Sequence, residues 1–238
     1  MAAPFGRLAT SDAGSAEPAF DCALCPRLVD YRAANRTSEP TWHNAPVHSF
    51  GDPTARLLIV GLAPGLKGAN RTGRPFTGDY AGNLLYATLL EFGLAKGRYG
   101  ACTDDGLTLT DCMITNAIRC VPPENKPTPA ELNACRPFLA QRIRSLSKLA
   151  AILALGRIAH DSALAALDLR KSAYHFAHGA RHSLPSGLAL FDSFHCSRYN
   201  TNTGKLTAEM FRAVVHAVQK ELLARAELDG QARDLRGH

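Results

Sequence analysis

Four short apolar runs divide the chain, and each has the length of a buried strand. They span residues 56–60, 111–118, 149–155 and 188–194. Between them lie segments whose apolar residues recur every three or four positions, which is the spacing of a helix packed on a sheet. Strands that alternate with helices are typical of a parallel sheet covered on both faces. The pattern therefore predicts an α/β fold around a central four-stranded parallel sheet.

One helix start can be predicted from its individual residues. Thr128 can cap a helix, Pro129 suits its first position, and Glu131 can complete a capping box, so we expect a helix from there to about residue 145. Other helices are expected over 22–29, 83–92, 157–167 and from residue 207 onward. The stretches 37–54, 93–109 and 170–187 are rich in polar residues, glycine or proline, and we expect irregular chain there.

The length of the chain is enough for one large α/β domain or two small ones. The chain has 238 residues, 46% of them hydrophobic, which is enough for a full core. We expect a flexible lead-in over 1–20, a single domain over 21–226 and a charged tail over 227–238. The net charge of +6 suits a polyanionic partner. No apolar run approaches a membrane span, and the first residues lack the order of a secretory signal, so we expect a cytoplasmic protein.

A long glycine-rich loop, residues 61–82, follows the first predicted strand. Ligands of open α/β sheets bind at the carboxyl ends of strands, and glycine allows backbone N–H groups to approach them closely. The loop matches neither the P-loop nor the dinucleotide-binding glycine pattern. Arg71 and Arg74 can meet phosphate, and Asp79 is the only carboxylate of the loop. Polar groups also follow two other strands, over 116–125 and 195–200, and we expect these three segments to converge.

Seven cysteines in a chain of this kind indicate metal binding more than disulfides. Four of them form two pairs of candidate ligands: Cys22, Cys25, Cys120 and Cys135. Four thiolates can hold Zn²⁺ or an iron–sulfur cluster, and spacing alone does not choose between them. The alternative is that they are buried free thiols. The remaining three, Cys102, Cys112 and Cys196, have no pair partner.

Five motifs in this order resemble those of the family 5 uracil-DNA glycosylases. They are CxxCPRL over 22–28, GLAP over 61–64, GANRTGRPFTGD over 68–79, RCxPPxNKPTP over 119–129 and HxSxxNTxTGxLT over 195–207. Leu62 stands where the related family 4 enzymes have glutamate, which favours family 5. Cys196 departs from the superfamily's usual His-Pro-Ser. The resemblance implies a three-layer α/β/α fold and hydrolysis of the N-glycosidic bond of deaminated bases in double-stranded DNA.

The resemblance also implies roles for individual residues. It implies a [4Fe–4S] cluster on Cys22, Cys25, Cys120 and Cys135. The catalytic residues are expected to be Asp79, Asn125 and His195; the base-binding residues Gly61, Ala63, Pro64, Phe76 and Asn116; and the phosphate contacts Arg71, Arg74, Ser197 and Arg198. Taken alone, each key side chain also fits a structural role: Asp79 as a helix cap, Phe76 in the core, Asn116 as a backbone cap and His195 as a structural histidine. Five histidines match no motif: His43, His48, His175, His178 and His182.

The breadth of the substrate range is expected to follow from two small residues. In uracil-specific relatives the first motif places a tyrosine that blocks the thymine methyl group, and an aspartate two residues before it. Gly65 and Ala63 occupy these positions here. A roomier pocket rejects larger bases poorly, so hypoxanthine and xanthine are expected as further substrates.

Two other functions remain open at this stage. One is a non-catalytic module that binds DNA damage on the same fold, and the other is a zinc-dependent hydrolase of free nucleotides. No lysine stands in a motif position that suggests a Schiff base, so a monofunctional glycosylase without β-lyase activity is expected. We also expect the protein to be a monomer. A uracil-DNA cleavage assay distinguishes these functions.

Overall fold

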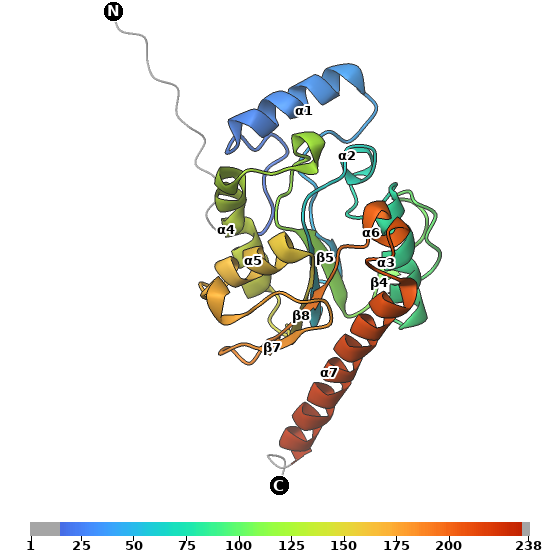
Figure 1. Cartoon of the computed structure of the whole chain (residues 1–238), viewed down its shortest axis with the longest axis vertical. Coiled ribbons are helices and arrows are strands. Elements are labelled where there is room, and N and C mark those ends of the chain that lie inside the picture. The colour runs from blue at the N-terminus through green and yellow to red at the C-terminus, as the bar shows by residue number, and fades with distance from the viewer. Residues whose placement is uncertain (1–14, 235–238) are drawn as a thin grey trace, which may run out of the picture.

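The computed structural model describes residues 15–234, and it is built on one mixed sheet (Figure 1). Four strands at its centre are parallel and completely buried: β5 (Cys112–Asn116), β2 (Leu57–Gly61), β6 (Ala151–Leu155) and β8 (Ala189–Ser193), in that order across the sheet. The predicted four-stranded parallel sheet is therefore confirmed.

Two short antiparallel strands extend this sheet beyond the prediction. β1 (Phe50–Gly51) pairs with β5, and β7 (Arg181–Ser183) pairs with β8. Both lie in stretches that we expected to be irregular. Strands of two or three residues carry no hydrophobic period of their own, and their pairing with a longer strand defines them. A separate hairpin joins β3 (Ala95–Lys96) to β4 (Thr108–Leu109) within the third such stretch.

Seven α-helices and two 3₁₀ turns complete the described part of the chain. The helices are α1 (Pro26–Ser38), α2 (Ala69–Thr72), α3 (Tyr80–Glu91), α4 (Pro129–Ser145), α5 (Arg157–Ala166), α6 (Arg198–Asn202) and α7 (Ala208–Asp234); the turns are η1 (Pro123–Asn125) and η2 (Lys171–Ala173). Thr128 and Glu131 form the predicted capping box at the start of α4. Within residues 15–234, the helices lack a stretch of the length and hydropathy that a membrane crossing requires.

The helices cover both faces of the sheet, which confirms the three layers (Figure 1). Leu57 and Ile59 of β2 belong to a core cluster that includes residues of α3 and α7. Leu58 and Val60, on the other face, join residues of α4 and α5. The alternation of side chains along a strand sends neighbouring residues into opposite layers, so a strand with a helix on each side is apolar throughout.

The two ends of the described chain differ from the expected lead-in and tail. Glu17 lies within the predicted lead-in, yet its carboxylate pairs with Arg119 and Arg142 and accepts the backbone N–H of Ser49. Residues 16–18 therefore pack against the domain, whereas Ala19 and Phe20 are exposed and 1–14 lie outside the described residues. At the other end α7 continues through Asp234, beyond the predicted start of the tail.

Candidate active site

The carboxyl ends of β2, β5 and β8 open into a cleft of about 740 Å³. Its lining comes from all three segments that we expected to converge. The lining residues are Leu62, Ala63, Gly65, Lys67, Ala69, Arg71, Phe76, Gly78, Asp79, Tyr80, Ala81, Asn116, Asn125, His195, Ser197 and Arg198. A cleft of this size accepts a nucleotide-sized ligand. The three predicted catalytic residues are brought together here.

The floor of the cleft is built by Gly61, Asn116 and Phe76. Gly61 and Asn116 are paired in register as the last residues of β2 and β5. A Cβ built on Gly61 would lie 2.6 Å from Cζ of Phe76 and would also collide with Oδ1 of Asn116. Only glycine therefore allows the amide and the ring to lie over the strand end, and Gly61 acts from beneath the cleft.

Asn116 has an unpaired acceptor at this floor. The residue is 2% exposed, and its Oδ1 is buried without a hydrogen-bond partner among the described residues. A buried acceptor without a donor costs about 1–3 kcal/mol. A ligand that presents an N–H group to Oδ1 would remove this cost.

Two aromatic rings form a wall beside it. Phe76 stacks on the imidazole of His195, with ring centroids 5.7 Å apart and planes inclined by 27°. Phe76 has φ of 54°, a left-handed conformation that bulky residues rarely adopt. The hydroxyl of Tyr99 donates to the carbonyl of Phe76 and helps to hold this conformation. Phe76 is thus both packed into the core and presented to the cleft.

His195 follows β8 and is neutral at ordinary pH. Burial lowers the pKa of its imidazole to about 4. The loop behind it is tied by two hydrogen bonds: the side-chain amide of Asn200 donates to the His195 carbonyl at 2.8 Å, and Ser197 Oγ accepts the Asn200 N–H at the start of α6. Cys196, which stands where the resembled motif usually has proline, is fully buried in the core. A neutral imidazole can donate a hydrogen bond to a developing negative charge.

Asp79 is both a helix cap and a carboxylate facing the cleft. Its Oδ1 accepts the N–H of Ala81 at 3.1 Å, which makes it the N-cap of α3. Its Oδ2 lies over two glycines, because a Cβ on Gly65 would be 2.9 Å from that oxygen and a Cβ on Gly68 would be closer still. Burial raises the pKa of Asp79 above its ordinary value, although hydrogen bonds from Gly82 and Ala81 oppose the shift.

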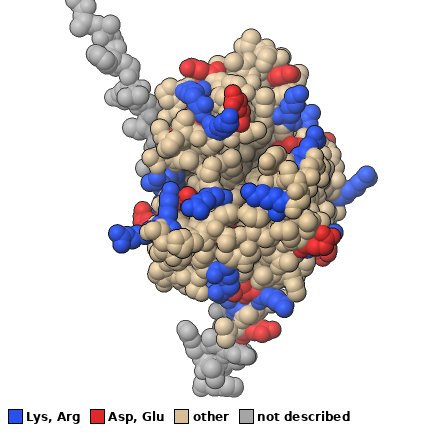
Figure 2. All heavy atoms as spheres, in the orientation of Figure 1, with Lys and Arg blue, Asp and Glu red and all other residues tan. Residues whose placement is uncertain are grey.

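Basic side chains border the cleft. Arg71, Lys67 and Arg198 are exposed residues of its lining, and the Arg198 guanidinium lies over the Tyr80 ring, 5.4 Å from its centroid. Figure 2 shows Lys and Arg side chains spread over the viewed face, several of them around a hollow in its upper half. Cations placed in this way suit the phosphates of a nucleic acid strand.

Arg74 does not belong to this set, and its prediction as a phosphate contact is wrong. The side chain is 4% exposed, and two guanidinium nitrogens donate to the carboxylate of Asp105 at 2.9 and 2.6 Å. The guanidinium also lies among the rings of Phe50, Tyr86 and Tyr99. Arg74 therefore anchors the glycine-rich loop to the chain around Asp105 from inside.

The other predicted residues lie near the site in different ways. Asn125 is exposed at the rim on η1, with φ of 56°, and Pro64 is buried behind the lining. Sequence reasoning did not assign Leu62, Lys67 or Tyr80 to the site. Their positions inside or beside matched motifs were the available signal, but the residue types alone do not show which side chains face the cleft.

The four paired cysteines also meet. Cys22, Cys25, Cys120 and Cys135 line one small cavity with an apolar shell that includes Leu28, Ile118 and Phe138. Burial raises the pKa of Cys25 to about 11 and that of Cys120 to about 12, with smaller contributions from the neighbouring cysteines. Arg32 Nη1 lies 3.8 Å from Cys120 Sγ and can donate to it.

The spacing of these sulfurs bears on the kind of metal group. Among the described residues, a search for three or more His, Cys, Asp or Glu side chains with donor atoms within 4.8 Å of one another does not group these cysteines. Sulfurs bound to a single tetrahedral zinc at about 2.3 Å would lie roughly 3.8 Å apart. In the part of the chain that the structure describes, no three of these sulfurs therefore have the spacing that a single bound zinc requires.

Comparison with known proteins identifies the family. Residues 48–219 match the model of the uracil DNA glycosylase superfamily. The chain belongs to this superfamily. The match covers the sheet, the cleft and the first part of α7, and it confirms both the resemblance in the motifs and the fold class.

Individual relatives refine the placement. The chain is 50% identical over 200 residues to a type-5 uracil-DNA glycosylase of Thermus thermophilus, covering 82% of this chain and 90% of the relative. It is 37% identical over 199 residues to a type-5 enzyme of Pyrobaculum aerophilum, covering 82% and 86%. A type-4 enzyme of the same organism is 38% identical over 120 residues, covering 50% and 52%. The similarity to type-5 enzymes thus extends over more of the chain.

Proposed function

We propose that this protein is a monofunctional DNA glycosylase that hydrolyses the N-glycosidic bond of uracil in double-stranded DNA. The observation that carries the proposal is the buried, unpartnered Oδ1 of Asn116 at the floor of the cleft. Family membership and the similarity to type-5 enzymes support the same activity.

Recognition rests on the edge of the base. A uracil flipped into the cleft can donate its N3–H to Oδ1 of Asn116 and accept from the amide N–H₂ at O4. Cytosine presents a lone pair at N3 and an amino group at C4. The N3 lone pair would face the Asn116 oxygen, acceptor against acceptor, and the amino group would face the Asn116 N–H₂, donor against donor. A site that hydrogen-bonds its substrate rejects such analogues strongly, because its polar groups are left unpaired. Phe76 offers a face on which the base can stack.

Cleavage divides charge between two sides of the bond. As the C1′–N1 bond breaks, its electron pair passes to uracil, and the neutral imidazole of His195 can donate to the oxygen that becomes negative. The sugar becomes cationic, and the ionised Asp79 can stabilise it and orient a water molecule toward C1′. The water oxygen bonds to C1′, and its proton passes to Asp79 or solvent. We propose that Asn125 assists at the rim.

A single-turnover assay on duplexes with one uracil tests this proposal. The unaltered protein should release uracil and leave an abasic site, whereas Asn116→Ala should lose at least about tenfold of kcat/KM because the base edge is unpaired. Asn133→Ala, at an exposed asparagine on α4 outside the cleft lining, is the matched control. Tight binding of uracil-containing DNA without base release would favour the non-catalytic damage-binding module instead.

We also propose that other deaminated bases, such as hypoxanthine and xanthine, are substrates. Ala63 and Gly65 leave more room for the base at positions where uracil-specific relatives carry larger side chains. The test is a panel of duplexes with uracil, hypoxanthine, xanthine or thymine, and release of uracil alone at high enzyme would refute the breadth. Adding bulk by Gly65→Tyr is a poor test, because the new side chain would meet Asp79 Oδ2 before it met the base.

The four cysteines are proposed to hold a [4Fe–4S] cluster. Such a cluster would cross-link the segment before α1, the chain after β5 and helix α4; hydrolysis needs no redox step, so its role is structural. Protein prepared without oxygen should be brown and contain about four irons per chain. Zinc without iron would exclude the cluster. Cys120→Ala should lose the iron, and Cys102→Ser, at an exposed cysteine outside the cavity, should keep it.

We further propose that the protein acts as a monomer. All segments that line the cleft come from one chain. Light scattering of the protein alone and bound to a short duplex would measure its mass, and a stable dimer in both states would contradict the proposal.

A further inference from the structure

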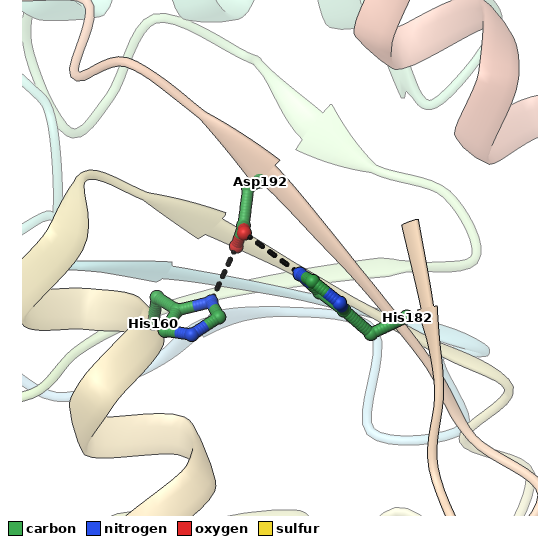
Figure 3. A group of neighbouring side chains, drawn as sticks. All are labelled: His160, His182 and Asp192. Atoms are coloured by element: carbon green, nitrogen blue, oxygen red, sulfur yellow. Dashed lines mark hydrogen bonds and ion pairs between the residues drawn. The ribbon is translucent and has the colours of Figure 1, made fainter. Parts of the chain in front are cut away.

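Three side chains of types that can bind metals meet outside the cleft, on the face of the sheet that α5 covers (Figure 3). They are His160 of α5, His182 of β7 and Asp192 of β8. Their donor atoms all lie within 4.8 Å of one another, and no other set of three or more His, Cys, Asp or Glu side chains in the described chain has this spacing. His160 Nδ1 is 2.7 Å from Asp192 Oδ1, and His182 Nε2 is 3.1 Å from Asp192 Oδ2.

The second nitrogen of His160 has its own partner. Nε2 lies 2.9 Å from the backbone carbonyl of Tyr174. A carbonyl only accepts, so Nε2 carries a proton, and Nδ1 can then offer its lone pair toward Asp192 and His182. Histidines that bind metals commonly donate their other N–H to a carbonyl or carboxylate, which fixes the tautomer in this way.

The charge of Asp192 also needs a nearby cation. Asp192 and His160 are fully buried, and the two histidines are the ion-pair partners of Asp192 among the described residues. An ionised carboxylate away from water is costly unless a positive charge compensates it. A cation bound by all three side chains would supply that charge.

We propose that these three side chains bind a divalent transition metal of the zinc type. Two imidazoles and a carboxylate are ligands that zinc prefers, whereas Mg²⁺ and Ca²⁺ prefer oxygen. Zinc ligands about 2.0–2.1 Å from the ion lie roughly 3.3 Å apart in a tetrahedron. The donor atoms of the three side chains lie within 4.8 Å of one another, and each imidazole is already 2.7 or 3.1 Å from one oxygen of Asp192, Oδ1 for His160 and Oδ2 for His182. Binding would displace any proton on His160 Nδ1 and move the His182 proton from Nε2 to Nδ1.

The position of the site indicates a structural role. The ion would join α5, β7 and β8, and Asp192 lies three residues before His195 on the chain that leads from β8 to the cleft. The imidazole of His182 is 16% exposed, whereas the side chains of His160 and Asp192 are fully buried, so an ion can enter past His182. Tyr174 and Phe176 pack edge-on against the two imidazoles and shield the rest of the site.

Zinc content and X-ray absorption at the zinc edge test the proposal. Protein incubated with Zn²⁺ and dialysed should retain about one zinc per chain, with a first shell of nitrogen and oxygen near 2.0–2.1 Å. A shell of sulfur near 2.3 Å would place the zinc on the cysteines and overturn the proposal. Protein that retains no zinc would also overturn it, leaving a network held by protons alone. Both measurements use the unaltered protein, so their outcome does not depend on whether a variant folds.

A pair of histidine variants then locates the ion. His182→Ala should lower bound zinc at least tenfold and abolish any rise in Tm on zinc addition. His175→Ala, at an exposed histidine of the same segment, should bind zinc as the unaltered protein does. Equal zinc binding by both variants would overturn the assignment.

Discussion

The carboxylate of Asp79 lies directly against the Cα of Gly68: a Cβ built on Gly68 would stand 2.8 Å from Asp79 Cγ. Real Cβ atoms essentially never approach another atom so closely. Gly68→Ala should therefore push the carboxylate out of place. We expect uracil release to fall at least about tenfold and the free energy of unfolding to fall by about 1–3 kcal/mol, the usual cost of overpacking.

A double-mutant cycle checks this cause. If the methyl group acts through the carboxylate, Gly68→Ala should cost less stability in an Asp79→Ala background than in the unaltered protein. Additive losses of stability in the two backgrounds would show that Gly68 matters for some other reason. Denaturant unfolding of the four proteins measures the difference.

Asp79→Asn should separate function from stability. Asparagine caps helices as well as aspartate does, so α3 should keep its N-cap. Because burial raises the pKa of Asp79, its ionised form opposes folding as the pH rises past its unfolded pKa, and the neutral amide removes that penalty. We expect equal or higher Tm at pH 7 and a loss of turnover of about 10²-fold or more. Unchanged single-turnover rates would exclude a catalytic role.

Burial of His195 should make stability fall on the acid side. Its pKa is lowered to about 4 in the folded protein, against 6.5 when unperturbed, so the unfolded chain binds the extra proton first. The stabilisation is present above the unfolded pKa and is lost as the pH falls from about 6.5 toward 4. Between pH 7 and 5 this amounts to on the order of 1–2 kcal/mol.

Comparison with a variant that cannot titrate isolates this contribution. His195→Gln should lose less stability between pH 7 and pH 5 than the unaltered protein does. Denaturant titrations at the two pH values measure both losses. The same slope for both proteins would show that His195 does not cause it.

Arg71 and Arg74 should respond oppositely to replacement, although three positions separate them. Arg71→Ala should weaken DNA binding and reduce the slope of log affinity against log salt by about 1, as expected for a lost phosphate contact. Arg74→Ala should leave that slope unchanged but cost about 3–5 kcal/mol of stability, because it leaves the buried Asp105 carboxylate without its partner. Hydrogen bonds from Arg74 hold the pKa of Asp105 well below its usual range. Equal salt slopes for the two variants would refute this distinction.

The sequence by itself determined the layers of the fold and the location of the cleft. Each central strand is a run of apolar residues, because both faces are covered and every position meets a core. The start of α4 was predictable because Thr128 and Glu131 act within one turn. The motifs that follow β2, β5 and β8 converge because the carboxyl ends of parallel strands share one edge of the sheet.

Only the tertiary structure decided which side chains of those motifs face the cleft. Arg74 turns inward because Asp105, 31 residues away, offers a buried carboxylate that no local pattern reveals. β7 exists because β8 provides a partner, and that pairing brings His182 to Asp192 and His160. The type of a residue indicates what its side chain can bind. Its burial, the compensation of its charge and its close contacts depend on neighbours that are distant in the chain, and only folding brings these neighbours together.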